Sequence, residues 1–152
     1  MIAILVASLI LGAGDPGSVP GELLATKPDA IRSLPKVELK VGAGGQTVTY
    51  HGVALASVLA SRSQPIEGMP GLRDLADAVL LIRGADGYQA AVSAAAVAMD
   101  PKGERYLLAT SRDGQDRPAQ LIIPGDPKHA RWVRDVVAVR LVRLGGVVKA
   151  DQ

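Results

Sequence analysis

Residues 78–92 read AVLLIRGADGYQAAV, and this stretch decides the expected fold. The run 78–83 is rich in Val, Leu and Ile, which is typical of a buried strand. Asp86-Gly87 supplies the residues that a tight hairpin turn requires. Residues 88–92 then run back along the first strand. The stretch therefore predicts an antiparallel hairpin.

Strands and short helices are expected on both sides of this hairpin, because alternating apolar patterns and turn residues recur along the chain. The other expected strands are 37–41, 46–50 (ended by His51-Gly52), 105–111, 121–123 and 136–144, the last with Val137, Val139 and Leu141 on one face. The expected helices are 26–34, 55–60, 94–99 with Ser93 as cap, and 126–134 with Asp126 as cap. Strands outnumber helices, so the sequence predicts one α+β domain over residues 26–144, built on a mixed, largely antiparallel sheet.

The composition fits one globular domain and removes several kinds of chemistry. The chain has 152 residues, no Phe and one Trp, so Val, Leu, Ile and Ala must supply the core. It has no cysteine. Disulfides, cysteine-bound zinc, iron–sulfur clusters and thiol nucleophiles are therefore excluded.

The N-terminus resembles a secretion signal. Residues 2–11 are apolar or small, and the small residues Gly12, Ala13 and Gly14 follow. This pattern predicts a signal peptide over residues 1–14, although no basic residue precedes the apolar run. Ten residues are too few to span a bilayer. We therefore expect a periplasmic or secreted protein with no stable membrane span after cleavage.

The same glycines also fit the dinucleotide pattern G-x-G-x-x-G over residues 12–17. That pattern binds pyrophosphate only where the loop opens a helix. Pro16 and Pro20 interrupt the required helix, and no strand-helix-strand unit follows. The sequence does not support a nucleotide site.

Positive charge is concentrated at the C-terminal end, where residues 128–152 carry six Lys or Arg against two Asp. Such a surplus can attract an anion, and it can also be a solvated basic edge strand that discourages aggregation. Nucleic acid is not an expected partner, because the surplus is small and few aromatic residues are available for base stacking.

The usual catalytic motifs are absent, and the two histidines, His51 and His129, are far apart in sequence. The most suggestive segment is 126–133, DPKHARWV, which places cations and an imidazole at the start of an expected helix. Helix N-termini favour anions. The alternative is a helix capped by Asp126 with Trp132 in the core. The residues leave both readings open.

Five short segments in a fixed order carry a family resemblance: YHGVAL (50–55), ADGY (85–88), RDG (112–114), PAQLIIP (118–124) and KHARWVR (128–134). Together they resemble the molybdopterin-binding domain of sulfite-oxidase-like oxidoreductases, and most closely its short, exported, stand-alone versions. The resemblance covers residues 26–144. It implies a sulfite-oxidase-like fold and an association with the molybdenum cofactor.

The resemblance also implies a set of cofactor-binding residues. In the family, a Lys-x-x-Lys/Arg-Trp segment lies near the pterin phosphate. Residue by residue this points to Lys128 and Arg131, with His129 beside them and Tyr88 from the ADGY segment.

Two departures from the family pattern shape the expected function. The full enzymes hold molybdenum through a cysteine thiolate, which this chain lacks, and Gln120 stands where an arginine is usual. A soft thiolate ligand is not replaceable without changing the metal's electronics. We therefore expect an exported, non-catalytic binding or accessory module that recognises a pterin-like or other small anionic ligand, or a partner protein. The alternative is a molybdenum-cofactor-dependent oxidoreductase that binds its cofactor without a cysteine ligand.

Overall fold

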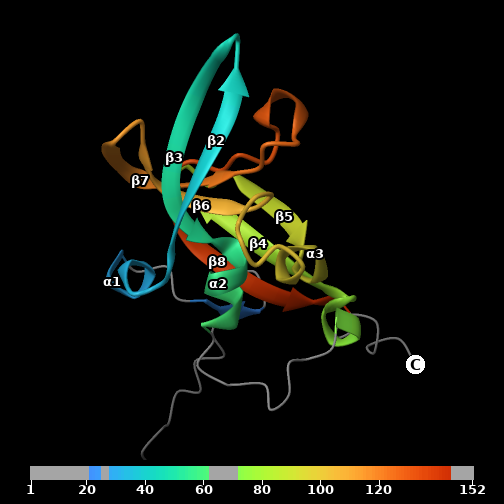
Figure 1. Cartoon of the computed structure of the whole chain (residues 1–152). Coiled ribbons are helices and arrows are strands. Elements are labelled where there is room, and N and C mark those ends of the chain that lie inside the picture. Colours follow the sequence, from blue (N-terminus) through green and yellow to red (C-terminus); the bar gives the residue numbers. More distant parts are fainter. Residues whose placement is uncertain (1–20, 25–27, 62–71, 145–152) are drawn as a thin grey trace, which may run out of the picture.

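A computed structural model describes residues 21–24, 28–61 and 72–144, which form two four-stranded sheets and a few short helices (Figure 1). The strands are β1 (Glu22–Leu23), β2 (Lys36–Ala43), β3 (Gln46–Ala54), β4 (Ala78–Gly84), β5 (Gln89–Ser93), β6 (Leu107–Arg112), β7 (Gln115–Ile122) and β8 (Val136–Arg143). The helices are α1 (Pro28–Arg32), α2 (Leu55–Ala60) and α3 (Ala94–Ala98), with 3₁₀ turns η1 (Leu72–Leu75) and η2 (Pro127–His129).

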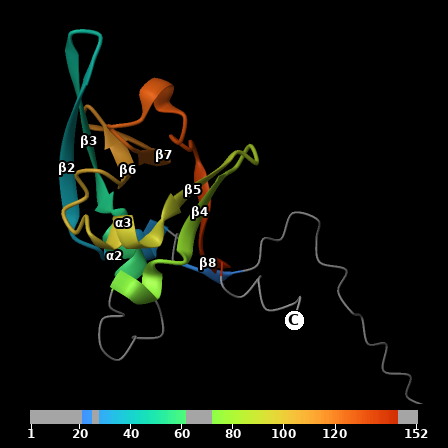
Figure 2. The ribbon, with the colours of Figure 1, turned by 90° about the vertical axis from the view of Figure 1, so that its right-hand side faces the viewer.

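The strand orders are β1-β8-β4-β5 in one sheet and β2-β3-β6-β7 in the other. Every pairing among the described strands is antiparallel. Figure 2 shows the β2–β3 hairpin on one side, β4 and β8 on the other, and α2 and α3 at the lower end. The expected α+β class and antiparallel character are confirmed, with two sheets in place of the expected single sheet.

The main core lies between the sheets and contains aliphatic side chains only, as the composition predicts. Val53 and Leu108 contribute from one sheet, and Leu80 and Val139 from the other. A second, smaller cluster lies on β3, β6 and β7. Trp132 packs against both clusters and so joins them.

The hairpin that decides the fold forms as expected. Val79 pairs with Ser93 and Ile82 with Ala90, so β4 and β5 run back along each other. Ser93 then begins α3, and its hydroxyl oxygen accepts a hydrogen bond from the backbone N–H of Ala96 at 3.2 Å. The predicted cap is confirmed.

The prediction that His51-Gly52 ends a strand is wrong, because β3 continues to Ala54. The register shifts between His51 and Gly52, where β3 pairs with β6. Glycine is needed at this bulge, since a Cβ on Gly52 would lie 2.1 Å from the carbonyl oxygen of Leu108. Gly52 therefore allows the backbones of β3 and β6 to approach closely at the bulge. It does not form a turn that ends the strand.

Two further expectations about strands need correction. The strand expected over 121–123 begins already at Gln115, because polar residues and Pro118 are tolerated on a strand at the edge of a sheet. In β8, Val139 and Leu141 are buried but Val137 is 54% exposed. Val136 pairs with Gly84 of β4 and Ala138 pairs with Arg83, so Val137 is the extra residue of a β-bulge. The bulge turns the side chain of Val137 away from the core.

The helix expected over 126–134 is also wrong. Only the turn η2 forms, and Lys128 and His129 have positive φ angles of 54°. Asp126 makes no side-chain bond to cap that turn. Without a helix there is no helix N-terminus to bind an anion.

The expected signal peptide, residues 1–14, and the start of the helix expected from Thr26 lie outside the described residues. In the part that the structure describes, no helix is long and apolar enough to cross a membrane.

Candidate functional site

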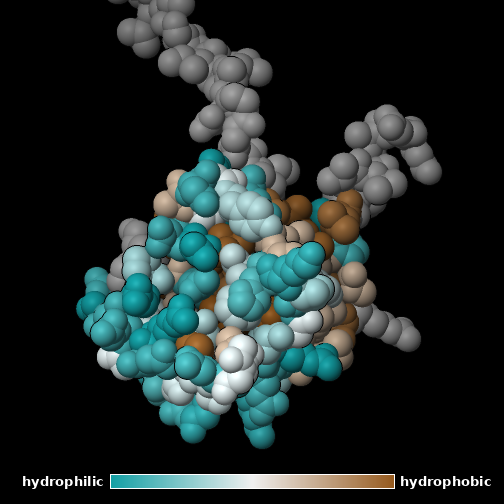
Figure 3. Space-filling model, turned by 90° about the horizontal axis from the view of Figure 1, so that it is seen from above, coloured by the Kyte–Doolittle hydropathy of each residue, from teal (hydrophilic) through white to brown (hydrophobic). Residues whose placement is uncertain are grey.

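A cavity of about 410 Å³ opens between the β2–β3 hairpin, strands β6 and β7, and the loop 124–135. We call it the arginine cavity. Its walls are Val41, Ala43, Val48, Tyr50, Ala109, Ser111, Arg112, Arg117, Pro118, Gln120, His129, Trp132, Arg134 and Asp135. Figure 3 looks down on this end of the molecule and shows hydrophilic side chains around recessed hydrophobic ones. The volume falls within the range of roughly 300–1,000 Å³ that small-molecule sites occupy.

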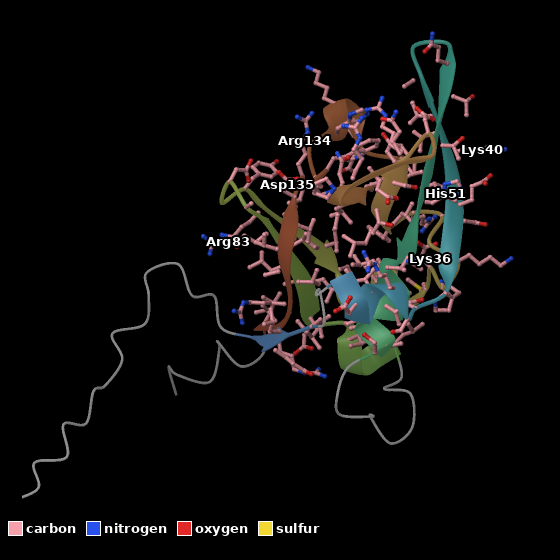
Figure 4. The ribbon with its side chains drawn as sticks, turned by 90° about the vertical axis from the view of Figure 1, so that its left-hand side faces the viewer. Lys36, Lys40, His51, Arg83, Arg134 and Asp135 are labelled. Carbon is pink, nitrogen blue, oxygen red and sulfur yellow. The ribbon has the colours of Figure 1, made fainter. Side chains whose placement is uncertain are left out.

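The charge around the arginine cavity is strongly positive. Arg112, Arg117 and Arg134 line it against a single carboxylate, Asp135. Arg112 lies 3.9 Å from Asp113 on its own turn, while no carboxylate in the described segments pairs with Arg117 or Arg134. Figure 4 shows Arg134 and Asp135 together at the start of β8. Three guanidinium groups around one concave surface favour an anion.

Aromatic rings form one wall. The imidazole of His129 stacks on the indole of Trp132, with ring centroids 3.7 Å apart and an interplanar angle of 11°. Tyr50 meets Trp132 edge to face at 6.1 Å. The indole is fixed further by its Nε1–H, which donates to the carbonyl oxygen of Ile123 at 2.7 Å. The stacked rings form a flat wall, which the contact with Tyr50 and the hydrogen bond to Ile123 hold in place.

The loop that carries His129 and Trp132 is held by an internal ion pair. The guanidinium of Arg131 donates from Nε to Asp126 Oδ2 at 2.7 Å and from a terminal nitrogen to Oδ1. The backbone N–H of Arg131 donates to the same carboxylate at 3.2 Å. Hydrogen bonding from Arg131 lowers the pKa of Asp126, and burial only partly opposes this effect. The pair therefore stays charged and fixes the loop.

Of the four residues that the family resemblance assigns to cofactor binding, one lines the arginine cavity and three do not. His129 lines the arginine cavity, but Lys128, Arg131 and Tyr88 are not among its walls. Arg131 is engaged by Asp126. The hydroxyl of Tyr88 donates to the carbonyl oxygen of Ala130 and so ties the β4–β5 turn to the loop.

Sequence reasoning missed the three arginines that line the cavity. Arg112 and Arg134 belong to the RDG and KHARWVR segments, but nothing in their spacing shows that they meet. Arg117 lies on the edge strand β7, in a stretch expected to be a loop. Only the pairing of β6 with β7 and the path of the loop bring these charges together.

The donor set does not fit thiolate-bound molybdenum. The chain has no cysteine, and within the described ranges no three His, Asp or Glu side chains gather as a metal site. Arg131, assigned to the pterin phosphate, already pairs with Asp126. The residues present therefore do not form the metal centre that the resemblance implies.

The chain matches no family model, no curated protein and no solved structure. The resemblance to the molybdopterin-binding domains stays a prediction.

Proposed function

We propose that this protein is an exported, non-catalytic binding module that recognises a small anionic ligand in the arginine cavity. The observation that carries the proposal is the three-to-one excess of guanidinium groups over carboxylates around a flat aromatic wall. Guanidinium groups bind carboxylates and phosphates through two parallel hydrogen bonds. The aromatic wall supplies a flat apolar surface beside them.

The geometry favours a flat anion of the pterin class. A planar ring can extend the stack on His129, and its acidic group can then bind the guanidinium of Arg134 or Arg117. Apolar side chains such as Val41 and Val48 also line the cavity. The ligand therefore needs both a ring and a negative charge.

A molybdenum-dependent oxidoreductase remains the alternative prediction from the sequence. It requires Lys128 and Arg131 to hold the cofactor phosphate, and Arg131 is bound to Asp126. A docking role toward a partner protein would use the same positive charge at its rim. Neither alternative explains why the aromatic stack lies inside the arginine cavity, and we favour a small ligand for that reason.

Calorimetric titration with pterin-6-carboxylate tests the proposal, with uncharged pterin and inorganic phosphate as comparison ligands. Trp132 is the only tryptophan, so quenching of its fluorescence reports binding at this cavity. We expect the pterin carboxylate to bind at least tenfold more tightly than either comparison ligand, because it alone engages both the ring wall and the arginines.

The variant Arg134→Gln should weaken binding of the pterin carboxylate about tenfold, because one charge-assisted hydrogen-bond donor is lost. Arg105→Gln is the matched control, since Arg105 is an exposed arginine that does not line the arginine cavity. Equal affinities of the two variants, or binding without quenching of Trp132, would rule out the arginine cavity as the site.

A further inference from the structure

A second cavity, of about 840 Å³, lies across the strands from the arginine cavity. Successive side chains of a strand point to opposite faces of its sheet. Tyr50 and Ala109 line the arginine cavity, and their neighbours His51 and Thr110 line the second one. At these residues of β3 and β6 the two cavities therefore lie on opposite faces, and they share Ser111, Arg117 and Pro118.

Cationic side chains contribute to the lining of the second cavity. Arg32 of α1, Lys36 of β2 and Arg117 of β7 line it, against the single carboxylate of Asp116. In the described chain no carboxylate pairs with Lys36 or Arg117. Arg32 lies 3.8 Å from Asp29, but both side chains are mostly in solvent, so this pair holds Arg32 weakly. His51 adds a ring whose Nε2 lies 3.1 Å from Glu38 Oε2.

Apolar side chains also line the second cavity. Ile31 and Val136, both buried, and Ala119 contribute to its wall. Val137 is the residue at the bulge of β8, and it presents an exposed aliphatic side chain to the same cavity. An exposed valine beside buried aliphatic residues gives a ligand chain an apolar surface to cover.

We propose that the second cavity binds a free medium-chain carboxylate, with the head group at Lys36 and Arg32 and the hydrocarbon chain against Val136, Val137 and Ile31. The mixed lining carries this inference, because cationic and aliphatic side chains border the same cavity and a carboxylate with a hydrocarbon chain matches both in one molecule. The volume is about twice that of the arginine cavity, which leaves room for a chain as well as a head group. This proposal goes beyond the proposed function: the cavities share Arg117, but the head-group residues Lys36 and Arg32 line the second cavity and not the arginine cavity.

A chain-length series tests the proposal, with butyrate, hexanoate, octanoate and decanoate titrated against the intact protein. Each added methylene that becomes buried should tighten binding by up to about fourfold, until the cavity is filled. Decanol should bind at least tenfold more weakly than decanoate, because it lacks the charge. Amide NMR shifts should change at Thr110 and Ala119.

Two lysine variants distinguish specific binding of the carboxylate head group from general electrostatic attraction. Lys36→Gln should weaken decanoate binding several-fold. Lys40→Gln should not, because Lys40 is an exposed lysine on the same strand that does not line the cavity; Figure 4 shows both side chains on β2. Val137→Ser should reduce the gain per methylene without changing butyrate affinity.

Three outcomes would overturn the proposal. Affinity that does not depend on chain length means that no apolar pocket is filled. An equal loss of decanoate affinity in the two lysine variants means that unspecific charge attraction holds the ligand. Affinity that falls as protein concentration rises means that a second copy of the chain occupies the cavity. Because Arg112 and Arg134 do not line this cavity, the variant Arg134→Gln should leave decanoate binding unchanged, so the two proposals fail separately.

Discussion

The carboxylate of Asp126 accepts hydrogen bonds from both the side chain and the backbone N–H of Arg131, five residues along the same loop. This one contact explains two features of the site. It holds the loop that presents His129 and Trp132 in the absence of a helix. It also occupies the guanidinium that the family resemblance assigns to a ligand.

Replacing Asp126 with Asn should destabilise the protein by about 1–2 kcal/mol, because a hydrogen-bonded charge pair becomes a weaker neutral contact. The side chain of Asp126 is only 6% exposed, so solvent does not replace the pair. Urea unfolding measures the change. The control Asp29→Asn should cost close to nothing, since Asp29 and Arg32 are 97% and 77% exposed.

The same pair predicts a pH dependence. The folded-state pKa of Asp126 is lowered from its ordinary value of 3.8, chiefly by hydrogen bonding from Arg131. A carboxyl group with a lowered folded pKa adds stability that is fully present above the unfolded pKa and is lost as pH falls through the folded pKa. The stability difference between the native protein and Asp126→Asn should therefore be constant near neutrality and shrink below pH 3.8. A difference that grows under acid conditions would contradict this assignment.

Tyr88→Phe should lower stability by about 1 kcal/mol, because the hydrogen bond to the Ala130 carbonyl is lost. Tyr88 does not line the arginine cavity, so affinity for pterin-6-carboxylate should stay within twofold of the native value. Thermal unfolding and calorimetric titration measure the two effects. A large loss of affinity with unchanged stability would instead place Tyr88 at the ligand, as the family resemblance implies.

Gly52→Ala should be strongly destabilising, by about 3 kcal/mol or more, because its new methyl group would collide with the backbone of Leu108. Gly42→Ala is the matched control on the neighbouring strand, where nothing lies within 4 Å of the added carbon. Chemical denaturation of both variants checks the contrast. If Gly52→Ala were as stable as the native protein, the backbones of β3 and β6 would not approach each other as closely as described at Gly52.

Asp100→Ala should cost about 3 kcal/mol, since Asp100 is a buried carboxylate that accepts three backbone N–H groups, those of Glu104, Arg105 and Tyr106, at 2.9–3.0 Å. Asp100→Asn keeps one acceptor oxygen and should cost less. Asp86→Ala serves as a control, because the exposed Asp86 accepts one hydrogen bond within the described residues, from the N–H of Tyr88. Its effect in urea unfolding should stay below about 1 kcal/mol.

Local patterns in the sequence predicted most of the strands and the short helices. Ser93 as a cap, the 78–92 hairpin and the α+β class are confirmed, because each depends on residues close together in the chain. The predictions at Gly52 and Val137 were wrong, because a bulge depends on how one strand fits another. The same reason explains why two sheets were read as one.

The candidate site was less predictable than the fold. Trp132 packs against the core, as one reading of segment 126–133 predicted, but the helix that both readings required does not form. His129 lines the arginine cavity. The three arginines were missed because they come from β6, β7 and the loop before β8, which meet only after folding. The expected helix failed because positive φ angles at Lys128 and His129 are unfavourable in any helix.

Pro118 has a further effect through its position on β7, the outer strand of its sheet. It has no backbone hydrogen to offer a foreign strand, and the charged Asp116 and Arg117 precede it on the same exposed margin. At high concentration, a second copy of the protein therefore cannot form a continuous row of backbone hydrogen bonds along this edge strand. We therefore expect that edge-to-edge strand pairing does not cover the two cavities that border this strand.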